Sequence, residues 1–232
     1  MQLQVVGVGQ AQAEARVQAL FESRTGSGAT DDQPDRLLLL GFAGAVDPLL
    51  RSGELSLPTR YYLAQEGEVQ RDFLEPDGRM WRQAVEAAAD AGLPVSQLDS
   101  LTVEHLVVSP AGKLALAREY HVGAVNMEDY WVAAAAKAAG VPFLSVRAVL
   151  DTASQRLPDF LLGLAEHRAK AILMAVAMPW RVPTFLRLGR QMRLAQHRLA
   201  GFALAFIDLV YDLEENWAKG RCPELSGPTA EC

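Results

Sequence analysis

Cysteine is scarce in this sequence, which holds two among 232 residues, and both lie near the C-terminal end. Neither Cys222 nor Cys232 has a histidine at metal-ligand spacing beside it. A disulfide framework or a zinc site would need more such residues. We therefore interpret the two as ordinary thiols in a reducing compartment, and we predict no metal site.

Long apolar runs are also lacking, since no uncharged stretch of about 20 apolar residues is present and no transmembrane helix is expected. The N-terminus shows no cationic segment followed by an apolar run and a small-residue cleavage site, so we expect a cytoplasmic protein. Basic residues are not in excess: 22 Lys and Arg against 28 Asp and Glu give a net charge of −6. This balance argues against nucleic acid as a partner.

What the chain does have is a composition that is half apolar, enough for one sizeable core. Residues 3–8, 11–22 and 37–40 are typical of a strand, a helix and a strand, an order that predicts parallel pairing and a sheet covered on both faces. Further strands are predicted at 54–62, 102–109, 121–127 and 141–150, and helices at 81–91, 113–120 and 129–139. The predicted fold is α/β: a three-layer αβα sandwich with a mostly parallel mixed sheet and a C-terminal helical extension.

The C-terminal part differs in charge from the rest. No acidic residue occurs between Glu166 and Asp208, a stretch that is rich in basic and apolar residues. We predict an α/β domain over residues 1–179 and a basic, amphipathic helical extension with a polar tail over 180–232. The extension either lies on an anionic membrane surface or packs as a helix on the core or on another subunit. The basic residues between Glu166 and Asp208 are Arg168, Lys170, Arg181, Arg187, Arg190, Arg193 and Arg198.

Two acidic residues follow the strands of the most regular predicted unit. Glu128 ends the strand at 121–127, and Asp151 ends the strand at 141–150. A right-handed crossover through the helix between them would make the strands parallel, with their carboxyl ends at one edge, where open α/β sheets bind ligands. Arg147 and Asp151 are four residues apart on a strand, so both should point to one face. By spacing alone, Asp151 also fits a helix N-cap and Glu128 a first-turn acid.

Three segments resemble the nucleoside phosphorylase and nucleosidase superfamily. The first joins Val-Asn-Met-Glu at 125–128 to Val-Pro-Phe-Leu-Ser-Val-Arg-Ala-Val-Leu-Asp at 141–151, similar to the family's V-x-M-E and VPF-x-x-VR-x-[IV]-S-D. The second is Gly-Phe-Ala-Gly-Ala-Val-Asp-Pro at 41–48 with Gly-Glu at 53–54, similar to a glycine-rich loop of the family. The third is Gly-Val-Gly at 7–9 before an Ala-rich helix. They occur in family order over residues 5 to 155.

The resemblance implies a role for each motif in breaking an N-glycosidic bond. Glu128 would hold the ribose hydroxyls and stabilise positive charge on the sugar, with Met127 packed against it. Asp151, with a raised pKa, would protonate the leaving purine. A loop at Gly41, Phe42, Ala43 and Gly44 would let the backbone approach the sugar or the nucleophile, and Arg147 is counted among the substrate-binding residues. No cofactor is implied, except phosphate as co-substrate if the enzyme is a phosphorylase.

The sequence departs from the family pattern in three places. We expect the chain to start too late for the family's first strand and loop, which in the hydrolases supplies the glutamate that activates water. Phe42 stands where many members have Ser, Thr or Cys, and Leu150 replaces the usual Ser before the aspartate. The attacking nucleophile is therefore not assigned. The expected partners are a small nucleoside and further copies of the chain.

A narrower resemblance is to hopanoid-associated phosphorylases, which release adenine from the lipid-linked nucleoside adenosylhopane. It depends on the apolar residue after Gly41, on Arg-Leu-Pro at 156–158, and on the basic tail. A lipid-linked substrate would agree with peripheral contact at the inner face of the membrane. The alternatives are a nucleosidase or phosphorylase for small soluble purine nucleosides, and a homologue that binds nucleosides without cleaving them.

Overall fold

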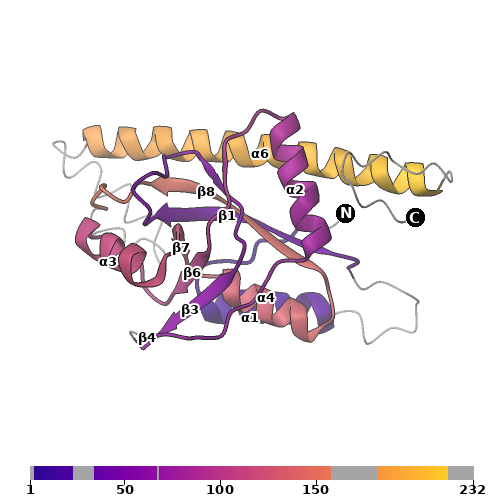
Figure 1. Ribbon diagram of the computed structural model, residues 1–232, viewed down its shortest axis with the longest axis horizontal. Coiled ribbons are helices and arrows are strands. Elements are labelled where there is room, and N and C mark those ends of the chain that lie inside the picture. The colour runs from indigo at the N-terminus through magenta and orange to yellow at the C-terminus, as the bar shows by residue number, and fades with distance from the viewer. Residues whose placement is uncertain (1–2, 23–33, 67, 158–181, 219–232) are drawn as a thin grey trace.

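A single eight-stranded mixed sheet forms the centre of the protein, as the computed structural model shows for residues 3–22, 34–66, 68–157 and 182–218 (Figure 1). The strand order is β4-β3-β6-β7-β1-β8-β2-β5. The strands are β1 Leu37–Ala45, β2 Leu55–Ser56, β3 Tyr61–Gln65, β4 Glu68–Val69, β5 Val95–Ser96, β6 Ser100–Val103, β7 Ala124–Asn126 and β8 Phe143–Asp151.

Helices cover both faces of this sheet. In Figure 1, α2 and α6 lie above it, α1 and α4 lie below it, and α3 lies near one end. The predicted α/β class and its helix–sheet–helix layering are confirmed. The helices are α1 Gln10–Glu22, α2 Gly78–Asp90, α3 Pro110–Tyr120, α4 Asp129–Ala138 and α6 Val182–Ala218.

Local signals explain where the helices begin and end, and α2 and α3 each begin three residues before the predicted starts at 81 and 113. The Asp77 side chain caps α2 by accepting from the backbone N–H groups of its first turn, and Ser109 caps α3 in the same way. Gly92 and Gly140 follow α2 and α4 with φ of 62° and 69°, the left-handed conformation that ends a helix. These helices are therefore determined largely by their own sequence.

The predicted first strand is wrong. Residues 3–8 form no strand, and Leu3 and Val5 are 88% and 83% exposed. The reason is topological: β7 and β8 already pair with the two edges of β1, so the opening segment finds no free edge there. It instead leads into α1, with Gly7 and Gly9 at positive φ.

The predicted glycine-rich loop is also wrong, because residues 41–44 continue strand β1. This strand pairs in parallel with β8 over its whole length, with a register shift between Ala43 and Gly44. Glycine weakens a strand unless something approaches the backbone closely. Here Arg147 and Asp151 lie over Gly41 and Gly44.

The predicted parallel crossover between β7 and β8 does not occur. Strand β7 pairs antiparallel with β1, and β8 pairs parallel with β1, so β7 and β8 run in opposite directions. Glu128 and Asp151 still reach one region, because the end of β1 contacts both neighbouring strands there. Gly44 of β1 faces both Val125 of β7 and Asp151 of β8.

Other strands were predicted too long. Those predicted at 102–109 and 121–127 are the shorter β6 and β7, at residues 100–103 and 124–126. Residues 54–62 divide into β2 and the start of β3, which lie far apart in the strand order. Pro58 lies between them and cannot donate to a ladder.

Helix α6 packs on the core. Its buried residues join a cluster with α2 and β8, so over this part of α6 the structure shows the core-packing alternative. Its basic side stays exposed, and the predicted domain boundary at 179/180 falls outside the described residues, as do both cysteines. No helix in the described ranges is long and apolar enough to span a membrane. The α6 residues in the core are Ala195, Leu199, Phe202, Phe206 and Val210.

The packing of α6 gives a stability prediction. Phe202 is 1% exposed and stacks with Phe206 at 5.7 Å between ring centroids. We expect Phe202→Ala to lower the free energy of unfolding by about 3–5 kcal/mol in denaturant titrations. Leu204→Ala is the control on the same helix, because Leu204 is 65% exposed and its change should stay within about 0.5 kcal/mol. If both variants lose an equally small free energy of unfolding, the packing of α6 on the core is contradicted.

Candidate active site

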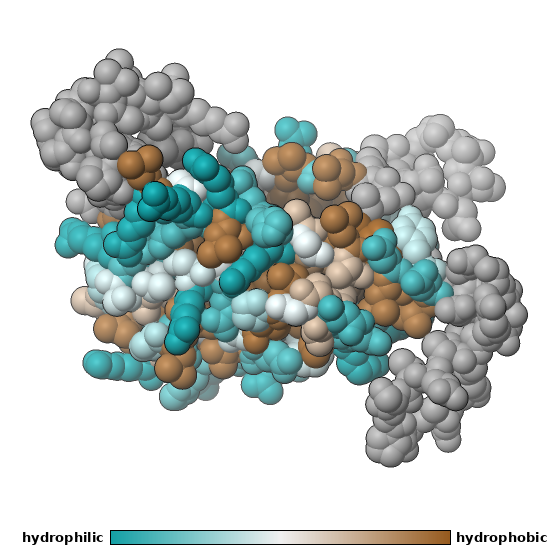
Figure 2. Space-filling model, turned by 90° about the horizontal axis from the view of Figure 1, so that it is seen from above, coloured by the Kyte–Doolittle hydropathy of each residue, from teal (hydrophilic) through white to brown (hydrophobic). Residues whose placement is uncertain are grey.

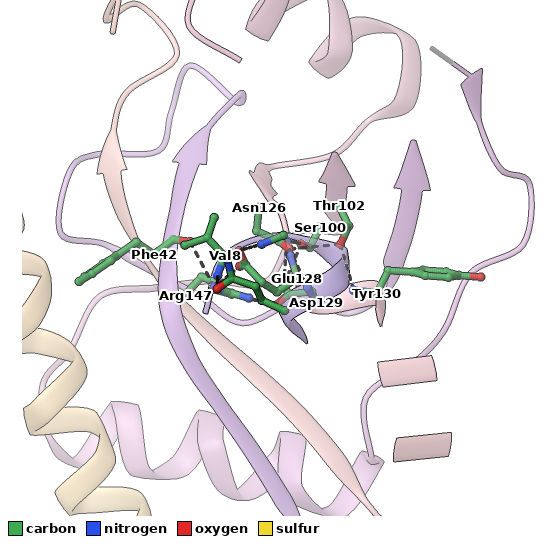
Figure 3. A network of polar contacts seen from close by, with 11 residues as sticks. Val8, Phe42, Ser100, Thr102, Asn126, Glu128, Asp129, Tyr130 and Arg147 are labelled. Carbon is green, nitrogen blue, oxygen red and sulfur yellow. Dashed lines mark hydrogen bonds and ion pairs between the residues drawn. The ribbon is translucent and has the colours of Figure 1, made fainter. Parts of the chain in front are cut away.

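Glu128 lies where β7 passes into α4, and it does not behave as a helix cap. It occupies the N-cap position of α4 but makes no side-chain cap hydrogen bond. Its Oε1 accepts from the backbone N–H of Gly9 at 3.1 Å, and its Oε2 lies 3.0 Å from Arg147 Nη1. The carboxylate is thus turned toward the sheet and the opening segment, in the centre of the network in Figure 3.

Arg147 is the buried cation of this network, with 4% of its surface exposed. Besides Glu128, it meets Asp129, whose Oδ1 lies 2.7 Å from Nη2 and accepts from Nε at 2.8 Å. Burial disfavours the charged guanidinium, but the two carboxylates outweigh it and raise the pKa of Arg147 above its ordinary value. A permanently charged arginine therefore fixes both acids.

Asn126 shapes the turn that presents these acids. Its Oδ1 accepts from the backbone N–H groups of Glu128 and Asp129 at 3.0 and 2.8 Å. Its Nδ2 donates to Ser100 Oγ and to Asp129 Oδ2 at 2.6 and 2.8 Å. These bonds tie the start of α4 to β6, so the turn is held from both sides (Figure 3).

Asp151, at the end of β8, is buried in a different setting. Its carboxylate forms an ion pair and hydrogen bond with Lys113 of α3, which is fully buried. Burial raises the pKa of Asp151, and the Lys113 ammonium opposes that rise without cancelling it. A carboxyl with a raised pKa is suited to give up a proton near neutral pH.

A small cavity lies beside Asp151. Its volume of about 30 Å³ is that of a water-sized group. Its walls are mostly apolar, with Asp151 and Asn126 as polar members. The lining residues are Gly44, Val103, Leu106, Val107, Val125, Asn126, Met127, Asp151 and Leu157.

The predicted site residues are brought together only in part. Met127, Gly44 and Asp151 line the cavity, and Arg147 and Glu128 form the adjoining ion pair. Gly41 lies directly beside the Arg147 guanidinium. The last two, Phe42 and Ala43, point elsewhere. Phe42 packs its ring against the core on the α6 side and offers only its carbonyl oxygen, 3.4 Å from Arg147 Nη1. Ala43 is buried in an apolar cluster with Leu50, Val149 and others.

Four residues of the site were missed by the sequence analysis: Lys113, Asp129, Asn126 and the backbone of Gly9. Asp129 had a signal, as an acid beside Glu128 with an arginine in the next strand. Gly9 belonged to the family-like Gly-Val-Gly motif at 7–9, but nothing in the sequence linked it to Glu128, which is 119 residues away. Lys113 had no signal, because it lies 38 residues from Asp151. No group of three or more His, Cys, Asp or Glu that could hold a metal ion occurs in the part of the chain described.

Comparison with known families agrees with this geometry. The sequence profile of the phosphorylase superfamily matches residues 2–178, and the chain belongs to that superfamily. The predicted class, a nucleosidase or nucleoside phosphorylase, is thereby confirmed. A comparison with curated proteins found no match.

Solved structures show the same fold. A 5′-methylthioadenosine/S-adenosyl homocysteine nucleosidase of Helicobacter pylori has 17% sequence identity and a TM-score of 0.63, over 88% of this chain and 77% of that one. The futalosine hydrolase of Helicobacter pylori gives the same identity, coverage and TM-score. The nucleosidase of Campylobacter jejuni has 21% identity and a TM-score of 0.57, over 73% of this chain and 77% of that one.

The close approach of Arg147 to β1 can be tested with a single methyl group. A Cβ at residue 41 would lie 2.1 Å from Arg147 Nη1, and its ion pairs leave that guanidinium little room to move. We expect Gly41→Ala to cost about 1–3 kcal/mol in thermal unfolding, as overpacking does.

Gly189→Ala is the matched control for this substitution. Gly189 lies in α6 with nothing within 4 Å of an added Cβ, so alanine should stabilise the helix by about 0.5–1 kcal/mol. A Gly41→Ala protein as stable as the wild type would mean that Arg147 does not occupy the space over β1.

Proposed function

We propose that this protein cleaves the N-glycosidic bond of a purine nucleoside. The proposal depends on one observation: two buried carboxylates, Glu128 and Asp151, lie near one cavity and have different surroundings. Glu128 is paired with the permanent cation Arg147, whereas Asp151 lies beside Lys113 and burial raises its pKa. A carboxylate held by an arginine and a carboxyl with a raised pKa suit separate charge-stabilising and proton-donating roles.

The roles follow from that difference, with the resemblance to the superfamily as further support. Glu128 accepts hydrogen bonds from the ribose hydroxyls and stabilises positive charge as the bond to the base breaks. Asp151 gives a proton to the leaving purine, which departs neutral. Met127, which lines the cavity beside Asp151, packs against the sugar.

Water is the proposed nucleophile. Arg147 pairs with both Glu128 and Asp129, so two carboxylates of the chain already compensate this cation. That compensation favours an uncharged nucleophile over a phosphate dianion. Release of free ribose, as opposed to ribose 1-phosphate, distinguishes a nucleosidase from a phosphorylase.

Adenine is the proposed base, and the apolar residues Val103, Leu106, Val107 and Leu157 are proposed to contact it. Because the cavity is water-sized, base binding must displace some of these side chains. Adenosine, methylthioadenosine and futalosine are suitable first substrates. We further propose that the enzyme acts as a homo-oligomer in the cytoplasm, which light scattering and fractionation would test.

A lipid-linked nucleoside such as adenosylhopane is a second candidate substrate, favoured by the exposed side of α6. Seen from above, this face carries hydrophilic side chains gathered where α6 begins (Figure 2). Arg187, Arg190 and Arg193 are exposed there, beside the part-exposed Leu186 and Met192. Leu199 is buried in the core, so any membrane contact depends mainly on charge. Such a helix would place the enzyme at an anionic surface.

The acid role of Asp151 gives the first functional prediction. Asp151→Asn should bind nucleoside but lose roughly 10²–10⁴-fold in kcat, because an amide cannot transfer a proton to the leaving base as an acid. Base release by liquid chromatography and binding by calorimetry separate the two effects. Full turnover in this variant would rule Asp151 out as the acid.

Glu128→Gln is the companion variant. It should weaken both binding and rate on ribonucleosides through lost charge-assisted hydrogen bonds, and discriminate less between ribose and 2′-deoxyribose than the wild type does. Tight binding by the wild type without any base release would instead indicate a non-catalytic nucleoside-binding protein.

The membrane proposal predicts salt-sensitive binding to anionic vesicles. The wild type should co-sediment with phosphatidylglycerol-containing vesicles at low salt and remain in the supernatant with pure phosphatidylcholine. Each exposed arginine contributes about 1 kcal/mol, so replacing Arg187, Arg190 and Arg193 by Gln should lower partitioning roughly 100-fold. A wild type that ignores anionic vesicles at low salt removes the support for a lipid-linked substrate.

A further inference from the structure

Lys113 is a fully buried lysine, and nothing in the mechanism above yet uses it. Its Nζ contacts the carboxylate of Asp151 and donates to the carbonyl oxygens of Thr152 and Gln155, at 3.1 and 3.0 Å. The three acceptors belong to the last residue of β8 and to the segment that follows it. One side chain of α3 therefore holds both the candidate acid and the turn behind it.

The three contacts indicate that Lys113 is charged. An ammonium has three N–H donors and no acceptor, so the three oxygens match it fully. A neutral amine would leave one buried oxygen without a donor, which costs about 1–3 kcal/mol. A buried ammonium placed against a carboxylate favours the ionised form of that carboxylate.

The segment that carries Asp151 is held at other points as well. The backbone N–H of Leu157 donates to the carbonyl of Val108 at 3.0 Å. The side chain of Gln155 exchanges hydrogen bonds with Gln191 of α6, which also donates to Ser52 at 2.9 Å. These neutral contacts fix the chain and leave Lys113 as the charged group that acts directly on Asp151.

Other charged groups near the site are occupied with one another. Arg147 of β8 pairs with Glu128 and Asp129 at the start of α4, while α6 and β1 present the uncharged Gln191 and Gly44 toward this segment. Lys113 of α3 is therefore the group whose removal would change the charge around Asp151.

We propose that Lys113 is a positioning residue that fixes the Asp151 carboxyl in the cavity and sets the upper pH limit at which Asp151 can donate its proton. The proposal rests on the proposed function, in which Asp151 is the general acid. It assigns to α3 a part in catalysis although Lys113 touches no substrate.

The sign of the effect follows from the charges. An acid works while it is protonated, so kcat/KM should fall as pH rises through the pKa of Asp151. The Lys113 ammonium lowers that pKa against the effect of burial. In Lys113→Met the opposing charge is gone, so Asp151 keeps its proton to higher pH and the basic limb of the profile moves upward.

The test compares pH profiles of kcat/KM for base release from a nucleoside. We expect Lys113→Met to move the basic limb up by about 1–3 pH units and to lower the plateau by up to about 100-fold through misplacement. Lys113→Arg keeps the positive charge but cannot reproduce the three contacts of the lysine Nζ. The basic limb of its pH profile should therefore stay near that of the wild type, while its plateau kcat/KM falls. Lys137→Met, a lysine of α4 outside this network, should change neither.

If Lys113→Met folds and the basic limb of its kcat/KM pH profile does not shift, the proposal is overturned. If that variant does not fold, Lys113→Met with Asp151→Asn decides the question, because it removes both buried charges together. Recovery of folding in the double variant supports the coupling of the two residues. If Lys113→Met destabilises the protein equally in the wild-type and the Asp151→Asn background, Lys113 has only a structural role.

A second measurement separates this proposal from the proposed function. Carboxyl ¹³C resonances titrate with pH, and the Asp151 resonance is identified by its loss in Asp151→Asn. An upward shift of its midpoint in Lys113→Met supports the proposal even if no nucleoside is cleaved, and an unchanged midpoint overturns it. Failure of the wild type to release base from any nucleoside would count against the proposed function alone.

Discussion

The site depends on one buried charge, the guanidinium of Arg147. A buried arginine is costly unless carboxylates surround it, and removing one partner of such a group typically costs about 3–5 kcal/mol. Here Asp129 and Glu128 supply the compensation, and through them Arg147 of β8 joins the start of α4 to the opening segment at Gly9. The glycine at residue 41 exists in β1 to let this side chain pass. Charge balance, more than apolar burial, therefore decides how these elements meet.

That arrangement also explains why two acids close to one another can serve different chemistry. Asp129 has its oxygens taken by Arg147, Asn126 and Ser100, and it is wholly buried, so it acts as the fixed counter-ion. Glu128 shares the same arginine and is 7% exposed. In the proposed reaction a ligand hydroxyl binds Glu128 while Asp129 holds the arginine in place. Asp129 thus keeps Arg147 in position, and Arg147 in turn keeps Glu128 in position.

The sequence indicated the residue types of the site better than the topology that assembles them. Helices α2 and α3 could be predicted from their own sequence, although each begins three residues before its predicted start, directly after the caps Asp77 and Ser109. The strand at 3–8 and the loop at 41–44 could not, since each outcome depends on which strands occupy the edges of β1. Glu128 and Asp151 were found through family motifs, yet the predicted parallel crossover that was to unite them is absent. The contacts of Lys113 with Asp151 and of Gly9 with Glu128 join residues that are 38 and 119 positions apart, so no local sequence pattern predicts either pairing.

The antiparallel contact between β7 and β1 has a consequence for how the two acids share one substrate. In a parallel arrangement both would stand at strand ends on a single rim, in similar solvent. Here Glu128 meets β8 at Arg147, within the strand, whereas Asp151 ends that strand beside α3. The two carboxylates therefore have separate cations, Arg147 and Lys113. The proposed reaction, in which one acid holds the sugar and the other donates a proton, is served by this separation. Independent ion pairs can be altered one at a time, which a shared rim would not allow.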